Sequence, residues 1–183
     1  CDDLSNAIIE ELGVSKQTDI LFNLSKTIIL VEGVADKACV EKFTKLLDFD
    51  ISNYHIHVCD GDAIIQTTYL CIKNNIKFIS ILDNDNKFKK NRYIKAHSMY
   101  KECLMFIEKA DNCFFIGSGE KGCLEDYIVD ENNKFKYYNT EKSVWKTDHV
   151  QIEDIKSVDE VSGNTLQNFE HLFSKMGLKK LIN

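Results

Sequence analysis

Short apolar runs alternate with amphipathic segments along the first two thirds of the chain. Four runs rich in β-forming residues predict strands at 27–31, 54–58, 78–82 and 113–116. Between them, apolar side chains recur at helical spacing in 34–49, 62–75 and 91–109. Because parallel strands need such crossover helices, the alternation predicts an α/β fold with a mostly parallel central sheet flanked by helices. The strands are apolar at nearly every position, which indicates burial on both faces of the sheet.

Three further elements are expected outside this alternation. The pattern favours an amphipathic helix at about 4–13, a hairpin in 134–145 and a final helix over 164–182.

Composition limits the classes of protein to which the chain can belong. A length of 183 residues with 44% hydrophobic residues suits a globular domain with its own core. The net charge of −6 argues against nucleic-acid binding over the whole surface of the protein, so any such binding would use a local basic patch. Seven widely spaced cysteines without a CxxC pair predict reduced, mostly buried thiols.

The localisation expected from these features is cytoplasmic, with no membrane contact. No apolar run approaches the roughly 18–20 residues that span a bilayer. The acidic, amphipathic start of the chain is not typical of a signal peptide. Because the chain begins with Cys1, we expect it to be a piece of a longer protein.

Two predicted strands end in acidic residues. The first runs into Glu32, and the third runs into Asp83 and Asp85. Because the carboxyl ends of parallel strands meet at one edge of a sheet, these acids are expected to lie close together, with Asp36 one helical turn after Glu32. Carboxylate oxygens in such a group suit Mg²⁺ or Mn²⁺. The alternative is that they are ordinary strand-end turn residues, since Asp and Asn are common in turns.

Other readings of the polar motifs are weaker. An EF-hand loop fails because Phe88 stands where its glycine is required. A phosphatase of the haloacid dehalogenase kind is disfavoured, because its acidic pair follows the first strand rather than the third. The GSGEKG stretch at 117–122 follows the fourth strand and reads as a flexible turn rather than a dinucleotide site. His55 and His57 are expected on a partly exposed strand face, without a third metal ligand nearby.

A basic stretch follows the acidic pair. Between 87 and 101 there are six Lys or Arg residues and no acidic ones. Most charge runs are solvated helix faces, but beside a metal centre such a run would attract a polyanion. The predicted DNA-binding residues are Lys87, Lys89, Lys90 and Arg92.

Three motifs in this order resemble a TOPRIM domain, the catalytic module of topoisomerases, primases and some nucleases. They are TIILVEGVAD (27–36), CDGD (59–62) and ILDNDN (81–86). The resemblance covers about 26–130 and implies a Rossmann-like sheet with the acids as metal ligands.

A narrower resemblance points to the OLD (overcoming lysogenization defect) nucleases. Residues 11–33 resemble the junction where an ABC-type ATPase domain runs into TOPRIM, although no Walker motif occurs in this chain. CLEDYI at 123–128 is similar to a later acidic motif, which implies Glu125 as a ligand in competition with Glu120. FSKMGLKK at 173–180 implies a late catalytic lysine, Lys175, in competition with Lys179 and Lys180.

The activity implied by the resemblance is metal-dependent hydrolysis of phosphodiester bonds in DNA. One or two Mg²⁺ or Mn²⁺ ions, and more naturally two, would be held by Glu32, Asp36, Asp83, Asp85 and Glu125. Glu32 would also act as general acid or base, and Lys175 would neutralise charge on the phosphate.

The same resemblance implies an organisation and a set of partners. It divides the chain into a lead-in helix and linker from an upstream domain at 1–26, the TOPRIM core at 27–130 and an extension that completes the domain at 131–183. The implied partners are DNA, an ABC-type ATPase domain in the same polypeptide and further copies of the chain. Phage defence or DNA repair is the implied role. The alternatives are an RNA-maturing TOPRIM nuclease and a non-catalytic regulatory or toxin-type module.

Overall fold

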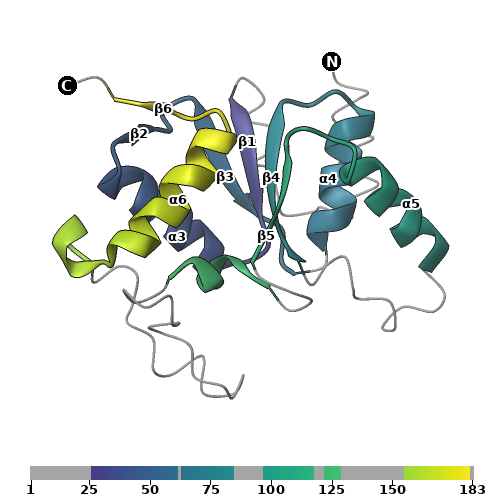
Figure 1. Cartoon of the computed structure of the whole chain (residues 1–183). Helices are drawn as coiled ribbons and strands as arrows, with labels where there is room; N and C mark the ends of the chain where they lie inside the picture. Colours follow the sequence, from purple (N-terminus) through teal and green to yellow (C-terminus); the bar gives the residue numbers. More distant parts are fainter. Residues whose placement is uncertain (1–25, 62, 85–96, 118–121, 129–154, 182–183) are drawn as a thin grey trace. The chain divides into compact units, whose positions relative to one another are not determined.

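The computed structural model in Figure 1 describes most of the predicted core. The described residues are 26–61, 63–84, 97–117, 122–128 and 155–181. They fall into two compact units, which are considered separately. The described residues of unit 1 fall within Cys1–Gly33, Asn53–Leu82 and Asn86–Phe115, and those of unit 2 fall within Val34–Ser52, Asp83–Asp85 and Ile116–Asn183.

The sheet of unit 1 has four strands in the order β3-β1-β4-β5. Their bounds are β1 Thr27–Val31, β3 Tyr54–Val58, β4 Phe78–Asp83 and β5 Cys113–Ile116. β1 pairs in parallel with both β3 and β4. Only the last residues of β4 and β5, Asp83 and Ile116, are grouped with unit 2. The predicted α/β fold with a mostly parallel sheet is confirmed.

The core of unit 1 forms between the sheet and two helices. These are α4, Ala63–Lys73, and α5, His97–Ile107, which pack side by side (Figure 1). Ile28 and Leu30 of β1 belong to the same buried cluster as Ile64 and Ile65 of α4. Burial of four aliphatic side chains of this size stabilises the unit by roughly 1.5–3 kcal/mol each.

The strand β1 is buried along its whole length. Ile29 and Val31, which point away from the cluster containing Ile28 and Leu30, are also fully buried. The strand is therefore buried on both faces, as the sequence predicted for a central parallel strand.

Unit 2 is built around aromatic rings on two helices. Its elements are α3 Val34–Leu46, β2 Phe49–Asp50, the 3-10 turns η3 Leu124–Tyr127 and η5 Val158–Glu160, α6 Gly163–Lys175 and β6 Lys179–Lys180. Phe43 of α3 stacks on Phe169 of α6, with ring centroids 3.9 Å apart. Ser162 caps the start of α6 by accepting a hydrogen bond from the Thr165 N–H at 3.1 Å.

Two predicted helices are too long in the sequence reading. The helix expected over 34–49 ends at Leu46, and the final helix expected over 164–182 ends at Lys175. Gly177 then adopts a φ of +76°, a left-handed conformation that commonly terminates helices. The residues beyond each helix form β2 and β6, which pair in an antiparallel manner.

Several expectations concern other parts of the chain. The helix at 4–13, the hairpin in 134–145 and the start of the segment 91–109 lie outside the described residues. His57 is 7% exposed, so the expectation of a partly exposed strand face is wrong at that position. In the part of the chain that the structure describes, all six cysteines are free thiols and four of them are buried. Among the same residues, no helix is both long and apolar enough to cross a membrane.

Candidate metal centre

In unit 1, the turn after β1 is joined to the loop after β3. The N–H of Cys59 donates to the Val31 carbonyl at 2.9 Å, and the N–H of Gly61 donates to the Glu32 carbonyl at 3.0 Å. Asp60 and Gly61 both have left-handed φ angles, +53° and +68°, which turn the loop toward these partners. The first two predicted motifs are therefore held together by main-chain hydrogen bonds, with Glu32 at the carboxyl end of its strand.

In unit 2, the acidic end of β4 is joined to the segment that begins η3. The Leu124 N–H donates to Asp83 Oδ1 at 3.3 Å, and the Asn84 N–H donates to the Gly122 carbonyl at 2.9 Å. Asp83 and Leu124 are 41 residues apart in the sequence. The fold therefore brings the DxD motif against the CLEDYI motif, whose Glu125 has its backbone in η3.

The second acid of the CLEDYI motif has a structural role. Asp126 Oδ2 accepts a hydrogen bond from the Cys123 N–H at 3.1 Å, and Asp126 Oδ1 lies 3.7 Å from the thiol of Cys123. These contacts cap the 3-10 turn from within. Asp126 is thus engaged in holding η3 in shape, which leaves Glu125 as the acid of this motif predicted to bind metal.

Asp36 is a buried carboxylate in the first turn of α3. It is 6% exposed and lies in the first turn of the helix. α3 packs against η3 within unit 2. Unit 2 therefore contains Asp36, Asp83 and the backbone of Glu125, whereas Glu32 lies in unit 1.

One comparison with known proteins identifies the segment that carries these acids. Residues 24–85 match the family described as overcoming lysogenization defect protein-like, TOPRIM domain. This segment is an OLD-like TOPRIM domain. The match spans about a third of the chain and includes Glu32, Asp36, Asp83 and Asp85. No curated protein and no solved structure matches the chain.

The TOPRIM assignment fixes the broad class of activity. TOPRIM is a metal-binding fold of the nuclease and primase type, so this domain falls among metal-dependent enzymes that act on nucleic acids. The matched segment ends before η3, so the pairing of Asp83 with Leu124 comes from the structure alone.

The donor atoms of the TOPRIM motifs fit a hard divalent cation. The predicted ligands are carboxylates, whose oxygens Mg²⁺ and Mn²⁺ prefer. The nearby thiol of Cys59 does not compete, because burial above all, together with the negative charges of Asp60 and Glu32, raises its pKa to about 12. A protonated thiol is a poor metal ligand. Within the described ranges, no three His, Cys, Asp or Glu side chains already form a metal-binding group.

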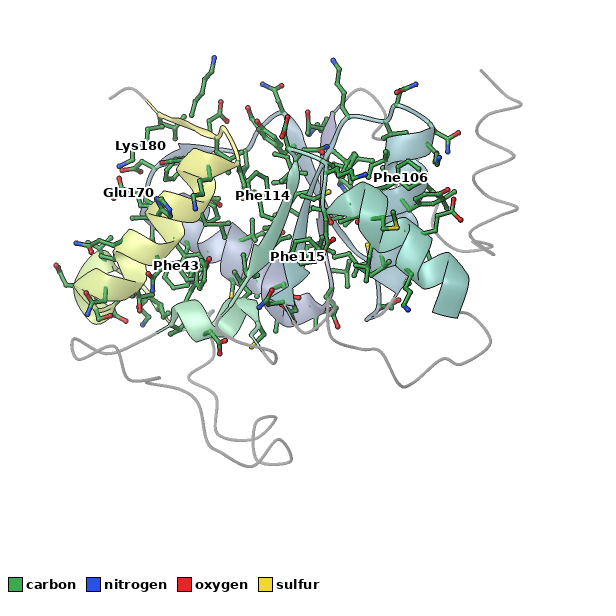
Figure 2. The ribbon with its side chains drawn as sticks, turned by 45° about the vertical axis from the view of Figure 1, so that its right-hand side comes forward. Phe43, Phe106, Phe114, Phe115, Glu170 and Lys180 are labelled. Carbon is green, nitrogen blue, oxygen red and sulfur yellow. The ribbon has the colours of Figure 1, made fainter. Side chains whose placement is uncertain are left out.

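The structure separates the three candidate lysines. Lys180 of β6 forms an ion pair with Glu170 of α6 (both are labelled in Figure 2). The Lys180 ammonium also lies 5.6 Å from the centre of the Phe49 ring. Lys179 is exposed on β6, and Lys175 is exposed in the last turn of α6. Lys175 follows Asn168 by seven residues, two helical turns on the same face, and Asn168 donates to the Tyr127 carbonyl of η3 at 3.2 Å. Lys175 therefore lies on the face of α6 that contacts η3, whereas Lys180 already has a carboxylate partner.

The remaining predicted site residues lie outside the described part of the chain. They are Asp85, Lys87, Lys89, Lys90, Arg92, Glu120 and the side chain of Glu125. Sequence reasoning missed Asp126 and Asn168. The sequence does not distinguish an acid that caps a turn, such as Asp126, from an acid that binds metal. Asn168 belongs to no sequence motif.

Proposed function

We propose that this OLD-like TOPRIM domain is a Mg²⁺- or Mn²⁺-dependent endonuclease or nickase that hydrolyses phosphodiester bonds in DNA. The observation that carries the proposal is the hydrogen bond from the Leu124 N–H to Asp83 Oδ1, 3.3 Å long. If the acids were only turn residues, each would be expected to make local contacts. The contact between two acidic motifs 41 residues apart instead favours a shared site.

The proposed roles follow from the chemistry of each side chain. Two metal ions would be held by the five predicted carboxylates, Glu32, Asp36, Asp83, Asp85 and Glu125. When bound, such ions activate a water molecule and stabilise the leaving oxygen. Close carboxylates repel one another in the absence of such ions. Glu32 also transfers a proton as general acid or base.

Basic residues complete the proposed site. Lys175 neutralises charge that develops on the phosphate. Lys87, Lys89, Lys90 and Arg92 bind the DNA backbone, so binding is expected to weaken with rising salt concentration.

The proposal includes a larger assembly. An ABC-type ATPase domain preceding residues 1–26 in the same cytoplasmic polypeptide would control access to DNA, and copies of the chain would associate. This arrangement suits a role in phage defence or DNA repair. An RNA-maturing nuclease with the same fold and a non-catalytic TOPRIM module are the competing functions.

The test is nicking of supercoiled plasmid by the 183-residue chain in Mg²⁺ or Mn²⁺. Asp83→Asn is expected to abolish nicking, while Asp159→Asn, at an exposed position in η5, is expected to leave it unchanged. The Asn side chain retains an oxygen that can accept the Leu124 hydrogen bond, so the comparison isolates the charge. Nicking that survives Asp83→Asn at the wild-type rate would contradict the proposal. Cleavage of RNA but not of plasmid would favour the RNA-maturing alternative.

A further inference from the structure

The 3-10 turn η3 is attached to α6 by a hydrogen bond and a ring contact. Asn168 Nδ2 donates to the carbonyl of Tyr127, the last residue of η3, at 3.2 Å. The Tyr127 ring meets the Phe169 ring edge to face, with centroids 5.8 Å apart. Two consecutive residues of α6 therefore hold the end of the turn whose second residue is Glu125.

Helix α6 is itself firmly placed within unit 2. The rings of Phe43 and Phe169 are stacked with an angle of 8° between their planes, and both are fully buried. Phe43 belongs to α3, the helix whose first turn carries the buried Asp36, and its label in Figure 2 stands beside α6. α6 is therefore packed against α3, which carries the predicted ligand Asp36. Because Asn168 of α6 is hydrogen-bonded to η3, the position of η3 depends on the position of α6.

The other end of η3 contacts the DxD motif. Leu124, the first residue of the turn, donates to Asp83. The turn has only four residues, so a change of its orientation at Tyr127 also changes the direction of the Leu124 N–H and of the Glu125 backbone. Half-buried Asn168 reaches η3 from α6 with a side-chain hydrogen bond to its last carbonyl.

We propose that Asn168 is a positioning residue of the metal centre, which holds η3 so that Glu125 and Asp83 bind the same cation. The inference rests on the proposed function. It gives the segment after the matched TOPRIM residues a defined part in metal binding. Groups that hydrogen-bond directly to metal ligands typically contribute about 10- to 100-fold to affinity. Asn168 acts one step further away, through a single hydrogen bond to a neutral carbonyl, so its contribution is expected at or below about 10-fold.

The experiment compares Asn168→Asp and Asn168→Ala with wild type in the 183-residue chain. Asp has nearly the same shape as Asn, but its carboxylate cannot donate to the Tyr127 carbonyl. Gln167→Ala is the matched control, because Gln167 is the exposed neighbour on the same helix. For each protein, the Mn²⁺ dissociation constant is measured by calorimetry, the melting temperature in EDTA by circular dichroism, and plasmid nicking as a function of Mg²⁺ concentration.

Both Asn168 variants are expected to raise the Mn²⁺ dissociation constant and the half-saturating Mg²⁺ concentration by about 3- to 10-fold. Nicking at saturating metal should return to near the wild-type rate, which a general loss of folded protein would not produce. Gln167→Ala should match wild type in every measurement. Variants that bind Mn²⁺ within twofold of wild type would overturn the positioning role. A wild type that binds Mn²⁺ but does not nick would refute the nuclease proposal, while the shift in Mn²⁺ affinity would still support the role of Asn168.

Discussion

Gly117 occupies a position where the structure leaves no room for a side chain. It follows β5 directly and adopts a φ of +88°. A Cβ atom added there would lie 2.2 Å from the Cys123 nitrogen and 2.3 Å from the Gly122 carbonyl carbon. Both neighbours are main-chain atoms, which cannot rotate away as a side chain would. Gly117→Ala therefore requires the backbone at 117 and at 122–123 to separate.

The expected cost of Gly117→Ala has two parts. The left-handed conformation costs an L-residue about 1–2 kcal/mol, and overpacking typically costs about 1–3 kcal/mol more. The free energy of unfolding should therefore fall by about 2–5 kcal/mol. Because the Gly122 carbonyl accepts the Asn84 N–H, the displacement should also reach the strand end that carries Asp83 and weaken Mn²⁺ binding.

The matched control is Gly177→Ala. Gly177 has a similar φ of +76°, but a Cβ atom there meets nothing within 4 Å. Only the conformational cost of about 1–2 kcal/mol applies, and Mn²⁺ affinity should not change. Urea unfolding followed by circular dichroism measures both variants. Equal losses of stability in the two variants would refute the argument from the main-chain contact.

Three further predictions concern charge. In wild type, Mn²⁺ at 100 times its dissociation constant should stabilise the fold by about 2.7 kcal/mol, which raises the melting temperature by about 5–10 °C. Asp83→Asn should abolish this rise. An equal rise in the variant would contradict metal binding at Asp83. Lys175→Ala should slow nicking at least about 100-fold. Lys180→Ala should leave nicking unchanged and lower the free energy of unfolding by less than about 1 kcal/mol, because it removes only an exposed ion pair. Slower nicking in Lys180→Ala but not in Lys175→Ala would exchange their roles. Burial raises the pKa of both Cys71 and Cys113 from 9.0 to about 12. As pH rises from 9 toward 12, these thiols lose their protons in the unfolded chain before they do so in the folded one. The free energy of unfolding should therefore fall by up to about 1.4 kcal/mol per pH unit for each thiol. Urea unfolding at pH 8 and pH 10 should show a smaller loss in a Cys71→Ala/Cys113→Ala variant, and an unchanged loss would argue against this cause.

The sheet could be predicted from sequence because its strands are short, apolar and bounded by charged or turn residues. The predicted bounds of β1, β3 and β5 agree with the structure. The strands β2 and β6 were missed because two residues each show no periodicity. Gly177 was the available signal for the end of α6, since glycine after a helix commonly adopts the left-handed conformation found there.

The acidic strand ends could also be predicted, because parallel topology places the carboxyl ends of β1 and β4 at one edge of the sheet. The role of η3 could not. The hydrogen bond between Leu124 and Asp83 joins a main-chain group to a side chain across 41 residues, and such a contact leaves no pattern in the sequence. The role of Asn168 could not be predicted either, because an Asn in a helix is also common on faces exposed to solvent.

The most direct test of the metal centre is the location of Mn²⁺ by anomalous diffraction from crystals of the 183-residue chain grown with the ion. We expect an anomalous peak with a carboxylate oxygen of Asp83 at about 2.0–2.2 Å and an oxygen of Glu125 in the same coordination shell. A peak elsewhere, or a fully occupied ion whose shell excludes Asp83, would contradict the assignment of the DxD strand end as the metal site.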